Sequence, residues 1–379
     1  MTGIVNISLV GGQSMPVHVG LTVNKPGRVI LIHSSTSKEE AQRISDTCGY
    51  ACELIEFPIY DYKEVFEKVR SLLDKNFEQE IQVNVTSGTK HWAVAFSMLS
   101  VERQNVHIFY IDQNLFYHDL SEGYSKKLEI DMDIAKILRY NNQSGFTHVN
   151  LSDYTVDDLE VMRKVKVLRG NHFREFNMLT LTARDKDWAK LLITDPHPRK
   201  KLQGSLKGEV EYDKSSSEIL LTFFDKKGKR LDYTLASPHV GDIVFNAGWL
   251  EYQVAQLLSQ WEQAKEVWLN VKFPYIDGNT KNEIDVIVNM GNKLLFVECK
   301  TNIFDNTDID KFRTAVKNYG GTGSKALFIS DTSRMKAITM EKCKDSNIMH
   351  FCLLEKKGKD RKRSLFNMLE RELKIINKK

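Results

Sequence analysis

Short apolar segments alternate with amphipathic segments along the N-terminal half of this chain. The apolar segments are predicted to be buried strands at Ile4–Val10, Arg28–His33, Cys52–Phe57, Ile81–Thr86 and Val106–Ile111. Helical periodicity follows three of them, at Lys38–Cys48, Tyr62–Asn76 and Lys90–Arg103. Strands that alternate with helices pack as a parallel sheet covered on both faces. The pattern therefore predicts an α/β, doubly wound fold whose ligand sites lie at the carboxyl ends of the strands.

Polar, glycine-containing loops follow two of these strands. The first strand runs into Gly11–Ser14, and the fourth runs into Thr86–Lys90 immediately before a helix. Glycine lets backbone N–H groups approach a ligand, and a helix N-terminus with a lysine favours a phosphate. The candidate ligand-binding residues are Gly12, Gln13, Ser14, Thr86, Ser87, Gly88, Thr89 and Lys90. A tight strand-to-helix turn with a capping residue would have the same composition, and the spacing is not that of a Walker A loop.

The segment Asn282–Lys300 is predicted to be a β-hairpin. Its apolar and polar residues alternate, so Ile284, Val286 and Val288 are expected on one face and Glu283, Asp285 and Ile287 on the other. A two-residue turn at Gly291-Asn292 fixes the register, because the residue numbers of opposed positions then add up to the same value in every pair. This register places Asp285 opposite Glu298 and Glu283 opposite Lys300.

Two opposed carboxylates repel each other unless a cation neutralises them. Their oxygen ligands favour Mg²⁺ or Mn²⁺. Lys300 lies on the strand face of Glu298, where it is expected to orient or deprotonate an attacking water. Glu251, on a predicted amphipathic helix Gly248–Trp261, is a candidate third carboxylate, and the carbonyl of Cys299 a further ligand. The alternative is a surface hairpin with a solvated, charged face.

This arrangement resembles the PD-(D/E)xK nuclease superfamily, in which a helix with a glutamate precedes an aspartate and a Glu-x-Lys strand. The loop Thr86–Lys90 resembles the signature of CARF domains, the CRISPR-associated Rossmann-like sensors of cyclic oligoadenylates. Ser87 departs from that signature, which usually has glycine at this position. The two resemblances together match the layout of the ancillary type III CRISPR nucleases that cyclic tetra-adenylate activates.

The resemblance implies a homodimer in which one cyclic oligoadenylate lies across the twofold axis of the paired CARF domains. The cysteine usage separately predicts a cytoplasmic protein. It also implies an endonuclease that cleaves DNA or RNA in antiviral defence. Three parts are expected: a Rossmann-like CARF domain at 1–145, a helical and β-meander connector at 146–240, and a restriction-endonuclease-like domain at 241–379. The site residues of the nuclease would then be Asp285, Glu298, Lys300 and Glu251, with the Cys299 carbonyl as a metal ligand.

Composition agrees with this layout. The 379 residues are 41% hydrophobic and carry a net charge of +4, with five cysteines and no Cys-x-x-Cys pair. Such usage is typical of reduced intracellular proteins, and no apolar run is long enough to span a membrane. Basic residues between Lys356 and Arg363 form either a solvated charge run or a phosphate track.

Two other functions remain compatible with the sequence. One is a constitutive restriction or repair nuclease whose N-terminal domain binds DNA or a protein. The other is a non-catalytic CARF regulator that binds nucleic acid through a decayed nuclease fold. The intact pair of carboxylates and Lys300 argue against such decay.

Overall fold

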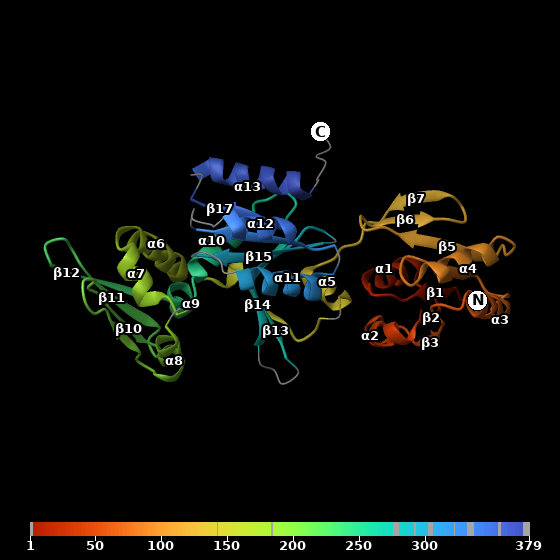
Figure 1. Cartoon of the computed structure of the whole chain (residues 1–379), viewed down its shortest axis with the longest axis horizontal. Helices are drawn as coiled ribbons and strands as arrows, with labels where there is room; N and C mark the ends of the chain where they lie inside the picture. The colour runs from red at the N-terminus through yellow and green to blue at the C-terminus, as the bar shows by residue number, and fades with distance from the viewer. Residues whose placement is uncertain are drawn as a thin grey trace.

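The computed structural model describes residues 3–141, 143–182, 185–275, 280–291, 293–301, 306–321, 323–331, 337–354 and 358–373. The molecule is elongated (Figure 1), with the N-terminal sheet at one end, a second mixed sheet in the middle and a small antiparallel sheet at the other end. Within the described residues, no helix has the length and apolar character needed to cross a membrane.

The N-terminal sheet has the strand order β3-β2-β1-β4-β5-β6-β7. Its strands are β1 (Val5–Leu9), β2 (Arg28–His33), β3 (Cys52–Glu56), β4 (Ile81–Asn84), β5 (Val106–Ile111), β6 (Phe116–Asp119) and β7 (Tyr124–Lys127). Strands β1 to β5 pair in parallel, and β6 and β7 extend the edge in antiparallel pairs. The predicted doubly wound sheet is confirmed, because the chain leaves β1 in one direction and returns on its other side at β4.

Helices cover this sheet at α1 (Met15–Asn24), α2 (Lys38–Thr47), α3 (Tyr62–Lys75) and α4 (Lys90–Ser100). The hydroxyl of Thr89 accepts a hydrogen bond from the backbone N–H of Trp92 and so caps α4. Helix α1 has no counterpart among the helices predicted from the sequence. Its sequence, MPVHVGLTVN, contains Gly20 and several β-branched residues, which weaken the helical signal.

The middle of the chain forms the short strand β8 (Thr147–Asn150), several helices and a separate antiparallel sheet. The helices are α6 (Val156–Asn171), α7 (Phe173–Thr180), α8 (Lys186–Thr194) and α9 (Val240–Phe245). The sheet contains β9 (Arg199–Lys201), β10 (Glu209–Asp213), β11 (Glu218–Phe224) and β12 (Arg230–Ala236). Strand β8 joins the central sheet instead, where it pairs with β13.

The central sheet has the strand order β17-β16-β15-β14-β13-β8. Its strands are β13 (Glu266–Pro274), β14 (Thr280–Asn289), β15 (Leu294–Lys300), β16 (Lys325–Ser330) and β17 (Ile348–Cys352). The helices of this part are α10 (Gly248–Leu258), α11 (Asn306–Gly320), α12 (Ala337–Asp345) and α13 (Gly358–Leu373). The antiparallel β13-β14-β15 segment continues into parallel β15-β16-β17 pairs.

One buried cluster joins the N-terminal and central sheets. It includes Val19 of α1 and Phe109 of β5, and it continues to Phe296 of β15 and Ile309 of α11. Helix α5 (Ile134–Tyr140) lies between the two sheets and contributes Ile137 and its neighbours. The two sheets therefore share an apolar core, which a flexible tether between independent domains would lack.

Candidate functional sites

The hairpin of β14 and β15 has the predicted register. The paired residues run from Val286 opposite Val297 to Asn289 opposite Leu294, and the same register continued by one residue places Asp285 opposite Glu298. The backbone N–H of Met290 donates to the carbonyl of Lys293 at 2.9 Å, which closes the turn. Gly291 has φ +106°, a conformation that favours glycine. The other predicted turn residue, Asn292, lies outside the described residues.

The regular alternation of β14 breaks at Asp285. Val286 packs in the buried cluster that includes α10, whereas Ile284 packs in the cluster that includes α11. The prediction that Ile284 and Val286 share a face is therefore wrong. On the neighbouring strand, Asn270 lies between the residues that pair with Val286 and Ile284, and its φ of 48° interrupts the pleat. Asp285 lies at this break, where its charge acts on Glu251 of α10.

Asp285 and Glu298 each have a close polar partner. The backbone N–H of Cys299 donates to Oδ2 of Asp285 at 2.6 Å. Lys300 Nζ lies 2.6 Å from Oε1 of Glu298. Burial and the charge of Glu298 raise the pKa of Asp285, against the opposing effects of Lys300 and of the Cys299 N–H. Burial by itself lowers the pKa of Lys300, but the carboxylates of Glu298 and Asp285 outweigh it and hold the pKa above its ordinary value.

Glu251 approaches this pair from helix α10. Burial raises the pKa of its carboxyl well above the usual value, and the negative charge of Asp285 raises it further. The close approach of α10 to Asp242 depends on Gly248. A Cβ at Gly248 would lie 2.8 Å from Oδ2 of Asp242, so a larger residue would displace that side chain or the start of the helix.

Two further acidic residues of this region, Asp242 and Glu283, were not among the predicted site residues. The negative charge of Asp242, on α9, acts on both Glu251 and Glu283. Burial raises the pKa of Glu283, although Lys272 Nζ lies 3.7 Å from its Oε1. The predicted register had given Glu283 a position but no role. Asp242 gave no local signal, because it reaches the site only through the packing of α9 against α10.

The donor chemistry of this cluster fits a hard divalent cation, because the carboxylates provide oxygen ligands and repel one another. Among the described residues, however, no three His, Cys, Asp or Glu side chains are grouped closely enough to form a complete metal site. The structure thus brings Glu251, Asp285 and Glu298 into one electrostatic neighbourhood, and the side chains would have to close further to share an ion.

A second candidate site is a cavity of about 450 Å³ in the N-terminal domain. It lies at the carboxyl ends of β1 and β4, where the strand order reverses. Of the predicted residues, Gly12, Gly88 and Thr89 line it. The two loops meet backbone to backbone, since a Cβ at Gly11 would lie 2.8 Å from the N atom of Gly88.

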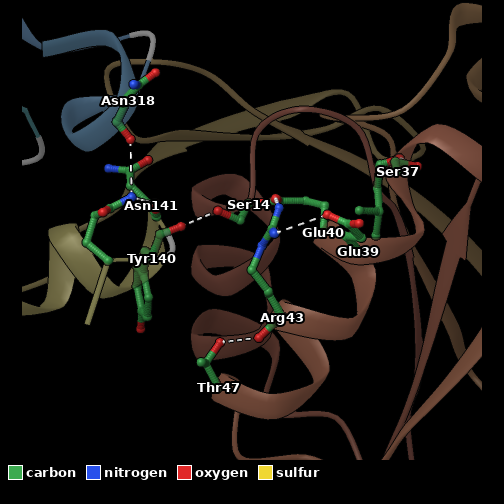
Figure 2. Close-up of polar contacts among 11 residues, drawn as sticks. Ser14, Ser37, Glu39, Glu40, Arg43, Thr47, Tyr140, Asn141 and Asn318 are labelled. Carbon is green, nitrogen blue, oxygen red and sulfur yellow. Dashed lines mark hydrogen bonds and ion pairs between the residues drawn. The ribbon is translucent and has the colours of Figure 1, made fainter. Parts of the chain in front are cut away.

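The other predicted residues have different surroundings. Ser14 is buried, and its hydroxyl donates to the carbonyl of Tyr140 (Figure 2). The hydroxyl of Thr86 donates to Asn84 at 2.6 Å and accepts from the backbone N–H of Ile111. Ser87 donates to the carbonyl of Gln13 at 2.9 Å. Lys90 is exposed at the first position of α4.

The cavity also has lining residues that sequence analysis missed. They follow β2 or lie on α2: Ser34, Thr36, Ser37, Glu39, Glu40 and Arg43. Arg43 pairs with Glu40 at 2.7 Å and with Glu39 at 3.7 Å (Figure 2). The run of four hydroxyl residues at 34–37, directly after a buried strand, was the signal that could have identified this wall.

Helix α5 makes polar contacts with both domains (Figure 2). The carbonyl of Tyr140 accepts from Ser14, which precedes α1 beside the cavity loop. Just beyond α5, Gln143 Nε2 donates to the carbonyl of Asn318 in α11 at 3.2 Å. Just before α5 begins, the carbonyl of Met132 accepts a hydrogen bond from Nδ2 of Asn289 in β14, at 2.5 Å. The end of α5 is therefore bonded to the domain with the cavity and to the domain with the carboxylates.

Comparison with known proteins assigns both domains. Residues 5–137 match the family model described as the Card1 CARF domain, and residues 242–349 match the model described as the Card1-like endonuclease domain. No curated protein sequence matches the chain.

Solved structures share the fold over nearly the whole chain. A structure of Can2 from Sulfobacillus thermosulfidooxidans in complex with cyclic tetra-adenylate is 20% identical, with a TM-score of 0.68 over 98% of this chain and 99% of that chain. Protein VC1899 from Vibrio cholerae is 16% identical, with a TM-score of 0.69 over 98% of each chain. A type III CRISPR defence DNA nuclease activated by cyclic oligoadenylate is 14% identical, with a TM-score of 0.56 over 98% of this chain and 52% of that chain.

The protein is thus an endonuclease that carries a CARF sensor domain in the same polypeptide. The N-terminal part matches the model of the Card1 CARF domain, and the C-terminal part matches the model of the Card1-like endonuclease domain. The fold class predicted from the sequence is confirmed. The resemblance of the whole chain to the CARF-domain ancillary nucleases of CRISPR systems is confirmed as well.

Proposed function

We propose that this protein is a metal-dependent endonuclease that cleaves DNA or RNA when a cyclic oligoadenylate, specifically cyclic tetra-adenylate, occupies its CARF domain. Its setting would be type III CRISPR antiviral defence. The observation that carries the proposal is the arrangement of Asp285, Glu298 and Lys300 on the β14–β15 hairpin beside Glu251. A family match to CARF and endonuclease domains supports both halves.

Asp285, Glu298, Glu251 and the carbonyl of Cys299 would hold Mg²⁺ or Mn²⁺. A bound divalent ion supplies Lewis acidity and a more acidic bound water. Glu251 and Asp285 have a physical reason to bind it, because burial and neighbouring negative charges already destabilise the charged forms of these two carboxylates. The Cys299 N–H bond to Oδ2 of Asp285 fixes the orientation of that carboxylate.

Lys300 would act on the attacking water and on the phosphate. Its pKa is held above the ordinary value by Glu298 and Asp285, so it is a cation at neutral pH. A cation in this position orients water through its N–H donors and stabilises negative charge that develops on the phosphate. The general base would then be a carboxylate of the cluster, and Lys300 would not itself accept the proton.

The cavity at the ends of β1 and β4 would bind the cyclic oligoadenylate. Backbone N–H groups of the loops at Gly12 and Gly88 suit phosphates. Glu39 and Glu40 are acceptors that suit the amino groups of adenine, and Arg43 provides a cation. Gln13, Ser14, Thr86, Ser87, Thr89 and Lys90 complete the proposed ring-contacting set. The solved Can2 structure contains cyclic tetra-adenylate on a similar fold, which supports this choice of ring size.

We further propose that the protein is a homodimer through α4. Val94 and Met98 of α4 and Val101, which follows the helix as its C-cap, recur at helical spacing on one face, and they are 49%, 58% and 83% exposed. The hydroxyl of Tyr62 lies 3.5 Å from the sulfur of Met98 and extends this apolar face. Since α4 begins at the cavity loop, pairing of two α4 helices would bring two cavities close to one twofold axis, as a ring of repeating adenylates requires.

The test is cleavage of supercoiled plasmid and of labelled single-stranded RNA and DNA with Mn²⁺, with and without cyclic tetra-adenylate. Wild type should cut only with the nucleotide. Glu298→Gln and Lys300→Ala should each lose about 100-fold or more of the rate while still binding the nucleotide. The matched control is Glu341→Gln, an exposed glutamate of α12, which should cut normally. Cleavage that persists in Glu298→Gln would move the active site elsewhere, and equal cutting without nucleotide would remove the switch.

A further inference from the structure

Cys48 and Cys52 form a close pair of thiols at the end of α2. Their Sγ atoms lie 3.4 Å apart, so the thiol of one donates to the sulfur of the other. Cys48 is the C-cap of α2, and Cys52 is the first residue of β3. The turn between them passes through Gly49, whose φ of 77° favours glycine. A small movement would therefore join the two sulfurs in a disulfide, whose S–S bond is about 2.05 Å long.

The two thiols differ in acidity. The hydrogen bond from Cys52 lowers the pKa of Cys48 to about 6, although partial burial acts in the opposite direction. The same hydrogen bond raises the pKa of Cys52, and burial raises it further. Cys48 is thus the thiolate of the pair at neutral pH. Since the thiolate is the form that attacks an oxidant, Cys48 has the character of the nucleophile and Cys52 that of the resolving thiol.

Cys48 is accessible to a small oxidant. It lines a cavity of about 380 Å³ together with Thr47, with His18 of α1 and with Tyr140 of α5. Both Cys48 and Cys52 are partly exposed, whereas the other three cysteines of the chain are buried. Cysteines that sense oxidants are accessible and have a resolving thiol beside them, which distinguishes this pair from the other three.

Helix α2 connects the thiol pair to the proposed ligand site. Near the start of the helix, Glu40 and Arg43 line the cavity at the ends of β1 and β4. At the other end, the hydroxyl of Thr47, next to Cys48, donates to the carbonyl of Arg43 at 2.7 Å (Figure 2). Ile44 is fully buried in the cluster between α2 and the sheet. Because packed interiors transmit strain, a pull on the end of α2 would displace the part that lines the cavity.

We propose that Cys48 and Cys52 are a redox modification site, at which a peroxide forms a disulfide that weakens ligand binding in the cavity lined by α2. The sulfur of Cys48 attacks one peroxide oxygen, the O–O bond breaks, and the hydroxide released takes up a proton to give water. The sulfur of Cys52 then attacks the resulting sulfenic sulfur, and its proton leaves with the hydroxyl group as a second water. The two sulfurs lose two electrons in total, which the peroxide gains.

The effect on the ligand rests on the proposed cyclic-oligoadenylate site, whereas the modification itself does not. A ligand site that is rigid before binding loses affinity when one wall is displaced. The disulfide would move Arg43 and Glu40 relative to the loops at Gly12 and Gly88, which line the same cavity. In a reducing compartment such a disulfide is transient, as redox sensing requires.

The first measurement treats the full-length protein with a small excess of hydrogen peroxide and counts free thiols after denaturation. Wild type should fall from five free thiols to three, lose the mass of two hydrogen atoms within one chain, and recover with dithiothreitol. Cys48→Ser and Cys52→Ser should form no such disulfide. Cys343→Ala is the matched control, because it removes a buried thiol of α12 and should still form the disulfide.

The second measurement is binding of cyclic tetra-adenylate before and after oxidation. Oxidised wild type and oxidised Cys343→Ala should bind at least about fivefold more weakly than their reduced forms. Cys48→Ser should bind equally in both conditions, and dithiothreitol should restore the affinity of wild type. Thiols that stay free, a disulfide between two chains, or an irreversible sulfinic acid would overturn the site.

Unchanged affinity after complete disulfide formation would overturn the effect on the ligand. Failure of the proposed function would be distinguishable, because the reduced wild-type protein would then not bind the nucleotide. In that case the thiol count would still decide whether Cys48 and Cys52 form the disulfide.

Discussion

Glu251 and Asp285 are acidic side chains in surroundings that disfavour their charged forms. Burial and neighbouring negative charges raise both pKa values, so ionising them at neutral pH lowers the stability of the metal-free fold. A divalent cation would reverse this effect. The same residues that we assign to catalysis are thus expected to oppose folding until the ion binds, a common trade-off between stability and function.

We predict that Glu251→Gln stabilises the metal-free protein and abolishes cleavage. Because the folded state raises the pKa of Glu251, the folded protein keeps a proton that the unfolded chain has already lost. Stability therefore falls as the pH rises from the ordinary carboxyl value through the raised one, above about pH 4. A glutamine at this position cannot ionise, so the variant does not lose stability in this way. The Tm in a chelating buffer should rise by about 1 °C for each kcal/mol recovered in a chain of 379 residues, and more at pH 7.5 than at pH 5.

The control for this measurement is Glu262→Gln, an exposed glutamate just beyond α10. It should leave both the Tm and its pH dependence unchanged. If the Tm of Glu251→Gln has the same pH dependence as that of wild type, the Glu251 carboxylate does not destabilise the fold. Added Mn²⁺ should reduce the difference in Tm between Glu251→Gln and wild type, because it should stabilise wild type more.

At the scale of elements, the hairpin was the most predictable part of the site and the helices around it the least. The turn at Gly291 and the alternation of β14 and β15 set the register from local sequence alone. The break at Asp285 was not predictable, because it depends on the backbone of Asn270 on a neighbouring strand. Asp242 was missed for a similar reason: it reaches the site through helix packing, which leaves no local signature in the sequence.

Helix α5 is the element that we expect to couple the two sites. Its end is bonded to Ser14 on the sensor side and, through Gln143, to Asn318 of α11 on the nuclease side. It also contributes to the cluster that both domains share. A shift of the cavity loops on binding would displace this helix against the nuclease sheet, which is packed too tightly to absorb the movement.

We predict that Gln143→Ala weakens activation by cyclic tetra-adenylate. A net contribution of about 1 kcal/mol for the lost hydrogen bond corresponds to about fivefold in the coupling between activator binding and cleavage. The measurement is the ratio of cleavage rates with and without saturating activator. Nucleotide affinity is measured in a catalytically inactive Glu298→Gln background. There, adding Gln143→Ala should change the affinity for the nucleotide by less than about fivefold.

Gln42→Ala is the matched control for this variant, since Gln42 lies on α2 and its Nε2 donates to Asp46 within the same helix, at 2.8 Å. It should activate as wild type does. If Gln143→Ala also activates fully, the coupling passes through the apolar cluster and not through the polar contacts at the end of α5.

For the whole molecule, the sequence predicted the order of domains because each domain has a local signature: the loop Thr86–Lys90 in one and the hairpin in the other. How the domains pack against each other could not be predicted from the sequence. The shared cluster combines Val19 and Phe109 with Phe296 and Ile309, and no periodicity links residues so far apart in the chain. The cavity wall at 34–43 was missed because it contains no glycine-rich loop, although it faces Gly12 and Gly88.

The apolar face of α4 makes the proposed dimer testable with one substitution. Met98 is 58% exposed and lies between Val94 and Val101, so Met98→Glu would place a charge at the centre of that face, where a second copy would bury it. We predict that this variant sediments as a monomer at concentrations where wild type is a dimer. Since one ring would then lack half of its contacts, the variant should also bind cyclic tetra-adenylate at least about tenfold more weakly.

Ile193→Glu is the control, because Ile193 is 80% exposed on α8, far along the chain from α4. It should remain dimeric and bind the nucleotide normally. A Met98→Glu protein that stays dimeric would place the interface on another surface. A monomer that still binds the ring with wild-type affinity would mean that one cavity of about 450 Å³ is sufficient, and the symmetric arrangement would then have no role in recognition.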